Sequence, residues 1–88
     1  MSKVYLVIVS SKIDRSSAIA HLQAKKLVTD WFYNLPNSFF VRSEESAKVI
    51  SDAIIGHFGR ERHFVLSTHD DRQGILPTKH WNRMKKDA

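Results

Sequence analysis

The chain has 88 residues, no cysteine and a formal net charge of +5, from 14 Lys and Arg against 9 Asp and Glu. This length fits a single domain, residues 1–88, and the 42% of apolar residues predicts one packed core rather than a disordered chain. The lack of cysteine excludes disulfides, zinc–thiolate sites and a cysteine nucleophile. The positive charge favours a polyanion as partner, and it equally fits a solvated surface that keeps a small domain soluble.

An apolar run opens the chain at residues 4–9. It is β-branched and aromatic without polar alternation, so it predicts a central strand over residues 3–10. The run is shorter than the ~20 residues needed to span a bilayer, and it lacks the layout of a signal peptide. We therefore expect no membrane partner and a cytoplasmic location.

The next segment predicts a helix with Asp14, Ser16 or Ser17 as its N-cap. Helical spacing places several apolar residues on one face, namely Ala20, Ala24, Leu27, Val28 and Trp31. The helix either continues through Trp31 or ends near Lys26 and is followed by a strand over residues 27–33. The β-branched and aromatic residues of that stretch favour the second interpretation.

Turn residues at 35–38 predict a hairpin with a return strand over residues 38–42. Ser43 is then the expected N-cap of a second helix. The buried face of this helix is predicted to contain Ala47, Ile50, Ala53, Ile54 and Phe58. Gly59 is expected to end the helix, and residues 63–68 form the last strand.

The order strand, helix, hairpin, helix, strand predicts an α+β fold, the ferredoxin-like βαββαβ two-layer sandwich. Its antiparallel sheet would have the strand order 4-1-3-2, with both helices on one face and the first strand central. The core spans residues 3–68, and residues 69–88 form a C-terminal extension with a short strand and a helical turn. The other sheet face is expected to be apolar and to meet a partner, most simply a second copy.

Two acidic positions are candidates for catalysis if the protein is an enzyme. Asp14 follows the end of the first strand, where a carboxylate could bind Mg²⁺, but it reads more simply as a helix cap. Asp70 lies between His69 and Asp71, but adjacent residues rarely converge on one ion. No other cofactor is expected.

A set of basic residues is the candidate nucleic-acid interface: Lys12, Arg15, Arg42, Arg60, Arg62 and Arg72. Arg60 and Arg62 are expected at the end of the sandwich where the last strand starts, and Arg42 at the opposite end. Basic side chains along one edge would bind phosphates without reading sequence. A scattered, solvated surface explains them equally well.

Aromatic residues on the two central strands are a second nucleic-acid signal, because an RNA-recognition motif stacks bases on such side chains. Tyr5, Phe39 and Phe40 occupy these strands. Alternation directs either Phe39 or Phe40 into the core.

Several of these segments together resemble the SinR-like proteins, which are similar to the small CRISPR-associated ferredoxin-like proteins and to the VapD-type ribonucleases. The segments are the opening run at 4–9, the aromatic hairpin at 31–42, the helix after Ser43, and residues 75–77 with Trp81. The resemblance implies a homodimer that binds or acts on nucleic acid. It also implies that residues 75–77 form a short fifth strand that is added to the sheet of a neighbouring protomer.

In the family that this chain resembles, the first strand usually ends in a Tyr-Asp pair whose Asp is the proposed metal ligand. That pair aligns here with Val9 and Ser10, so the expected carboxylate is missing. The leading hypothesis is therefore a small, basic, dimeric nucleic-acid-binding protein without nuclease activity. The alternatives are a divergent Mg²⁺-dependent endoribonuclease and a protein-interaction module, such as a phage or plasmid inhibitor.

Overall fold

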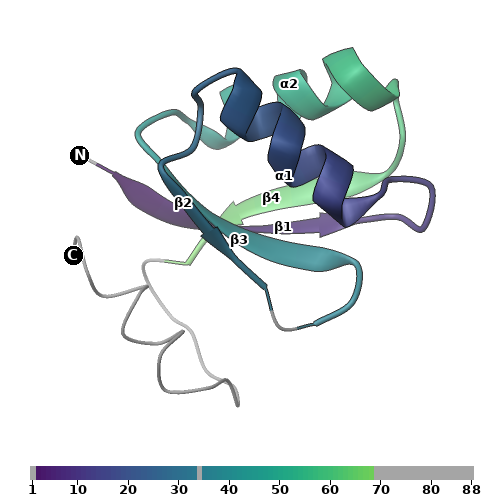
Figure 1. The fold of residues 1–88 in the computed structure, drawn as a ribbon, viewed down its shortest axis with the longest axis horizontal. Helices are drawn as coiled ribbons and strands as arrows, with labels where there is room; N and C mark the ends of the chain where they lie inside the picture. Colours follow the sequence, from purple (N-terminus) through teal and green to yellow (C-terminus); the bar gives the residue numbers. More distant parts are fainter. Residues whose placement is uncertain (1, 34, 69–88) are drawn as a thin grey trace.

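A computed structural model of the chain describes residues 2–33 and 35–68. Its elements, in chain order, are β1 (Lys3–Val9), α1 (Arg15–Ala24), β2 (Asp30–Phe32), β3 (Ser38–Ser43), α2 (Ala47–Phe58) and β4 (His63–Ser67) (Figure 1). The strand and helical turn expected in the C-terminal extension lie outside the described residues.

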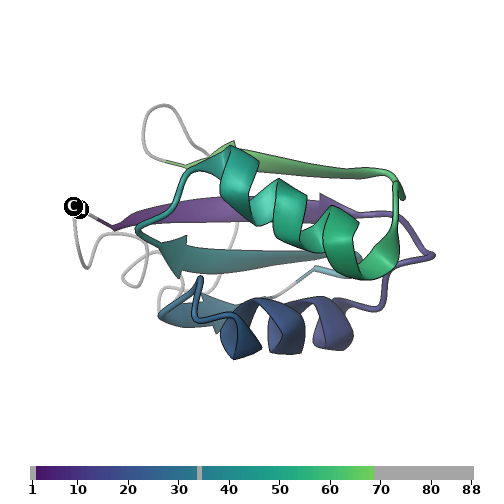
Figure 2. The ribbon, with the colours of Figure 1, turned by 90° about the horizontal axis from the view of Figure 1, so that it is seen from above.

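The strands form one antiparallel sheet with the order β2-β3-β1-β4. On the central strand β1, Leu6 pairs with Phe40 of β3 and with Leu66 of β4. Both helices lie on the same face of this sheet (Figures 1 and 2). The predicted α+β class, with two helices and a four-stranded antiparallel sheet, is therefore confirmed.

The main core lies between the sheet and the two helices. Val7 and Phe39, which are paired across β1 and β3, are fully buried there with Leu22 of α1 and Ile54 of α2. The sheet face opposite the helices, which we call the open face, carries a smaller cluster of Val4, Phe32 and Phe40 with Leu6 packed against it. The alternation of β1 thus supplies apolar side chains to both faces, as expected of a central strand.

The buried face predicted for the first helix is wrong. Ala18, Ile19 and Leu22 face the core, whereas Ala20 and Ala24 are exposed. The helix ends at Ala24, and Lys26 adopts a positive φ of 59°. Leu27 and Val28 reach the core from this non-helical connection, so a helical period extended through them gives the wrong face.

The strand predicted over residues 27–33 is present but shorter, because only Asp30–Phe32 pair with β3. The N-cap predicted for α2 is also wrong. Ser46 caps this helix and accepts a hydrogen bond from the Val49 amide. The predicted end at Gly59 is confirmed, and its φ of 82° is a conformation that favours glycine.

Ser43 is instead fully buried and links the connection between α1 and β2 to the connection between β3 and α2. Its hydroxyl donates to the Leu27 carbonyl oxygen and accepts a hydrogen bond from the Glu45 amide. The buried face predicted for α2 is confirmed, since Ile50 and Ile54 are fully buried and Ala47, Ala53 and Phe58 pack against the same core.

Candidate nucleic-acid interface

Three segments that are distant in the sequence meet where β1 ends. The Ser10 amide donates to the Arg62 carbonyl oxygen at 3.0 Å, and the Val9 amide donates to the Asn37 carbonyl oxygen at 2.9 Å. The start of α1 follows directly, and Figure 1 shows it at the same end of the molecule as the start of β4. This end therefore carries four of the predicted basic residues, Lys12, Arg15, Arg60 and Arg62; we call it the basic end.

Lys12, Arg60 and Arg62 are exposed at the basic end. Arg15 is more constrained, because its Nη1 donates to the Leu35 carbonyl oxygen at 2.9 Å and its guanidinium carbon lies 3.6 Å from the centre of the Tyr33 ring. Arg15 thus ties the connection between β2 and β3 to α1. A stacked guanidinium keeps its charge, so Arg15 still adds to the positive potential of this end.

Asp14 caps α1, as one of the sequence alternatives predicts. Its carboxylate accepts hydrogen bonds from the amide and the hydroxyl of Ser17, both at 2.9 Å. The bond from the Ser17 amide is the main reason that the pKa of Asp14 is lowered. Within residues 2–33 and 35–68, no three His, Asp or Glu side chains gather in a way that could hold a metal ion.

The remaining predicted site residues do not join the basic end. Arg42 lies near the far end of the sheet, paired with Val4 and Asp30, and is only 8% exposed. A side chain so buried offers little surface to a phosphate. Asp70 and Arg72 lie outside the described residues.

None of the three aromatic residues predicted to stack on bases offers an accessible ring. Tyr5 and Phe39 point into the main core, and burial raises the pKa of Tyr5, whose hydroxyl donates to the Glu45 carbonyl oxygen at 2.8 Å. Phe40 is on the open face but is 8% exposed, because it stacks on Phe32 with 4.8 Å between ring centres.

Sequence reasoning missed an exposed apolar pair on the open face at the basic end. Phe64 of β4 is 62% exposed, and Ile8 of β1, its direct partner in the ladder, is 42% exposed. They line a shallow hollow of about 370 Å³, together with Val9, Ser10, Arg62 and His63. Alternation along residues 62–64 could have placed Phe64 on one face of the sheet, but its exposure follows only once the face covered by the helices is known.

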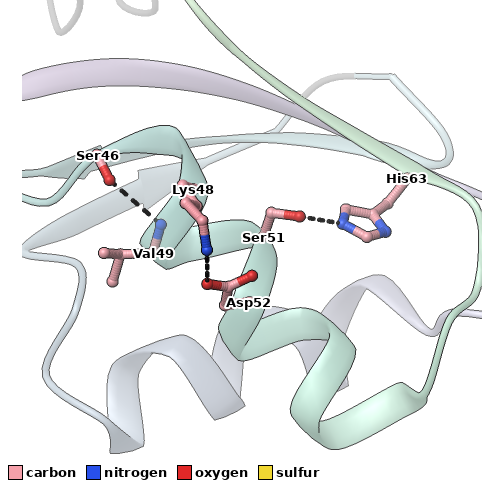
Figure 3. A network of polar contacts seen from close by, with 6 residues as sticks. All are labelled: Ser46, Lys48, Val49, Ser51, Asp52 and His63. Carbon is pink, nitrogen blue, oxygen red and sulfur yellow. Dashed lines mark hydrogen bonds and ion pairs between the residues drawn. The ribbon is translucent and has the colours of Figure 1, made fainter.

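His63 fixes the start of β4 against α2 (Figure 3). Its Nδ1 lies 2.8 Å from the Glu61 carbonyl oxygen, and its Nε2 lies 2.7 Å from Ser51 Oγ. Since a carbonyl oxygen only accepts, Nδ1 carries a hydrogen and donates it to Glu61, while Nε2 shares a hydrogen bond with the Ser51 hydroxyl. The imidazole therefore holds in place the strand that presents Arg62 and Phe64.

The chain matches no family model, and the searches found no matching curated protein or solved structure. In the part of the chain that the structure describes, no helix has the length and apolar character needed to cross a membrane.

Proposed function

We propose that this protein is a small ferredoxin-like homodimer that binds nucleic acid through its basic end and has no nuclease activity. The strand order β2-β3-β1-β4, with both helices on one face, supports the ferredoxin-like arrangement. Edge strands are surfaces on which copies of a chain pair, and here the edges are β2 and β4.

The observation that carries the proposal is the hydrogen bond from the Ser10 amide to the Arg62 carbonyl oxygen. It brings Arg62 beside the loop that holds Lys12, although fifty positions separate them in the sequence. Exposed cations that share one end of a small domain repel each other. Phosphates bound between them relieve this repulsion, and binding is further favoured because the nucleic acid releases its condensed counterions.

Binding of fluorescently labelled RNA and DNA, measured by anisotropy over a range of salt concentrations, tests the proposal. We expect the affinity to fall linearly with salt on logarithmic axes. The double variant Lys12→Gln/Arg62→Gln should reduce that slope by about 1.4 for a single strand and about 1.8 for a duplex, because each lost phosphate contact removes about 0.7 or 0.9.

The matched control is Lys3→Gln/Lys25→Gln, which removes the same charge from exposed positions at the opposite end of the molecule. It should leave the slope nearly unchanged. Equal losses in the two double variants would mean that net charge alone drives binding. Absence of binding to any nucleic acid would refute the proposal and favour a protein-interaction module.

The endoribonuclease alternative receives less support from the described residues. Asp14 uses its carboxylate to cap α1, and no group of possible metal ligands forms around it within residues 2–33 and 35–68. Asp70, its other candidate carboxylate, lies outside the described residues.

A further inference from the structure

We infer that the ligand of the basic end is single-stranded nucleic acid and that Phe64 is the platform on which one of its bases stacks. This inference rests on the proposed function and deepens it, because it names the form of nucleic acid that the site selects. Proteins that bind single strands combine a positive surface for the backbone with aromatic rings for the bases.

The register places an aromatic ring and a guanidinium on the same side of one strand. Arg62 and Phe64 are two residues apart, and the bond between the Ser10 amide and the Arg62 carbonyl oxygen continues the ladder beyond β4. Because side chains alternate along a strand, Arg62 and Phe64 both belong to the open face. Both line the same hollow, together with Ile8.

The exposure of Phe64 is local and is not a property of the whole open face. At the other end of that face, Val4, Phe32 and Phe40 are all buried. Phe64, at the basic end of the open face, is 62% exposed. The hydrogen bonds of His63 to Ser51 and Glu61 hold the start of this strand in place, so its backbone would lose little conformational freedom when a ligand stacks there.

Charge decides which occupant fits this hollow. An apolar segment of another protein would bury Ile8 and Phe64 but would offer no opposite charge to the exposed Arg62 beside them. A second copy seated with its own hollow on this one would bring two basic ends together, where their exposed arginines and lysines would repel each other. A nucleotide supplies both a flat ring for Phe64 and a phosphate for Arg62, and only an unpaired base exposes its face.

Three ligands of equal length separate the contributions: a single strand, its duplex, and an abasic single strand that keeps the phosphates but lacks bases. We expect the wild-type protein to bind the single strand more tightly than the other two. Phe64→Ala should weaken single-strand binding by about 5-fold to 150-fold and leave abasic binding unchanged, since one stacked base contributes about 1–3 kcal/mol.

Two further variants control for structural effects. Phe64→Trp should retain binding, and the single strand, but not the abasic strand, should quench the indole fluorescence that this variant gains over the wild type with its native Trp31 and Trp81. Val49→Ala removes an exposed apolar side chain from α2, on the opposite side of the sheet, and should have no effect. Because Phe64 is largely exposed, Phe64→Ala should fold normally, which circular dichroism verifies.

The outcomes distinguish this inference from the function on which it rests. If Lys12→Gln/Arg62→Gln weakens binding while Phe64→Ala does not, the basic end binds nucleic acid but the stacking platform is refuted. If Phe64→Ala instead turns a dimer into a monomer with unchanged nucleic-acid affinity, the patch is an interface between copies, and the inference is wrong. If no nucleic acid binds, both proposals fall together.

Discussion

At the scale of single residues, the two stacked histidines on the helix layer are the clearest source of pH dependence. The rings of His21 and His57 lie 4.2 Å apart between centres. The Nε2 atom of His21 is buried and has no hydrogen-bond partner among the described residues. Burial lowers the pKa of His21, and the charges of His57 and Lys25 add to this, while a hydrogen bond to the Ala53 backbone opposes it.

We predict that the protein loses stability as the pH falls below about 6.5, the ordinary pKa of histidine. Between that value and the lowered pKa of folded His21, the unfolded chain binds more protons, so acid favours unfolding and the full stability is present above this range. Urea denaturation from pH 5 to pH 8 measures the slope, which His21→Gln should flatten. An unchanged slope in His21→Gln would assign the pH dependence to other groups.

At the scale of elements, two serines near the start of α2 have different tasks, and their substitution should separate them. We predict that Ser43→Ala destabilises the protein by about 1–3 kcal/mol for each backbone group left unpaired, the Leu27 carbonyl and the Glu45 amide. Ser46→Ala, which removes only an exposed cap, should cost about 0.5–2 kcal/mol. Urea denaturation gives both values.

A larger loss of unfolding free energy in Ser46→Ala than in Ser43→Ala would contradict this assignment, because the helix cap would then stabilise the protein more than the buried hydrogen bonds of Ser43. Ser51, which is half-buried, provides no suitable comparison, since its hydroxyl is hydrogen-bonded to His63. Ser16→Ala on the exposed first turn of α1 is a better control and should change the free energy of unfolding very little.

The same elements show what local pattern can predict. The apolar spacing of α2 is unbroken from Ala47 to Phe58 and Gly59 ends it, so both the buried face and the C-terminus could be predicted. The face of α1 could not, because Leu27 and Val28 continue a helical period after the chain has left the helix at Lys25. Ser43 is a residue type that commonly caps helices, but here its hydroxyl donates to the Leu27 carbonyl oxygen, which only the folded chain brings close.

The candidate site is harder to predict than the helices, because its residues come from segments that are distant in the sequence. Arg60 and Arg62 could be assigned to the start of the last strand from the order of elements alone. Which aromatic ring is accessible could not be predicted, because accessibility depends on which sheet face the helices cover. Phe39 and Phe40 lie on a central strand, where an RNA-recognition motif carries its stacking rings, yet both are buried, whereas Trp31, Tyr33 and Phe64 are exposed.

At the scale of the whole molecule, the basic end joins segments from both halves of the chain. The end of β1, the start of α1, the connection between β2 and β3, and the start of β4 all meet there through backbone and Arg15 hydrogen bonds. A ligand that bridges Lys12 and Arg62 would therefore bind only the folded chain, because unfolding separates these residues. Binding and global stability should then be linked.

We predict that a single-stranded oligonucleotide raises the melting temperature of the protein. At ten times its Kd, the ligand should add about 1.4 kcal/mol of stability, which corresponds to a shift of about 6–11 °C for a domain of this size. The shift should shrink in high salt and in Lys12→Gln/Arg62→Gln but persist in Lys3→Gln/Lys25→Gln, as thermal denaturation with and without ligand can measure. A shift that survives both high salt and the loss of Lys12 and Arg62 would place the binding surface elsewhere on the molecule, because phosphate contacts at the basic end must weaken under both conditions.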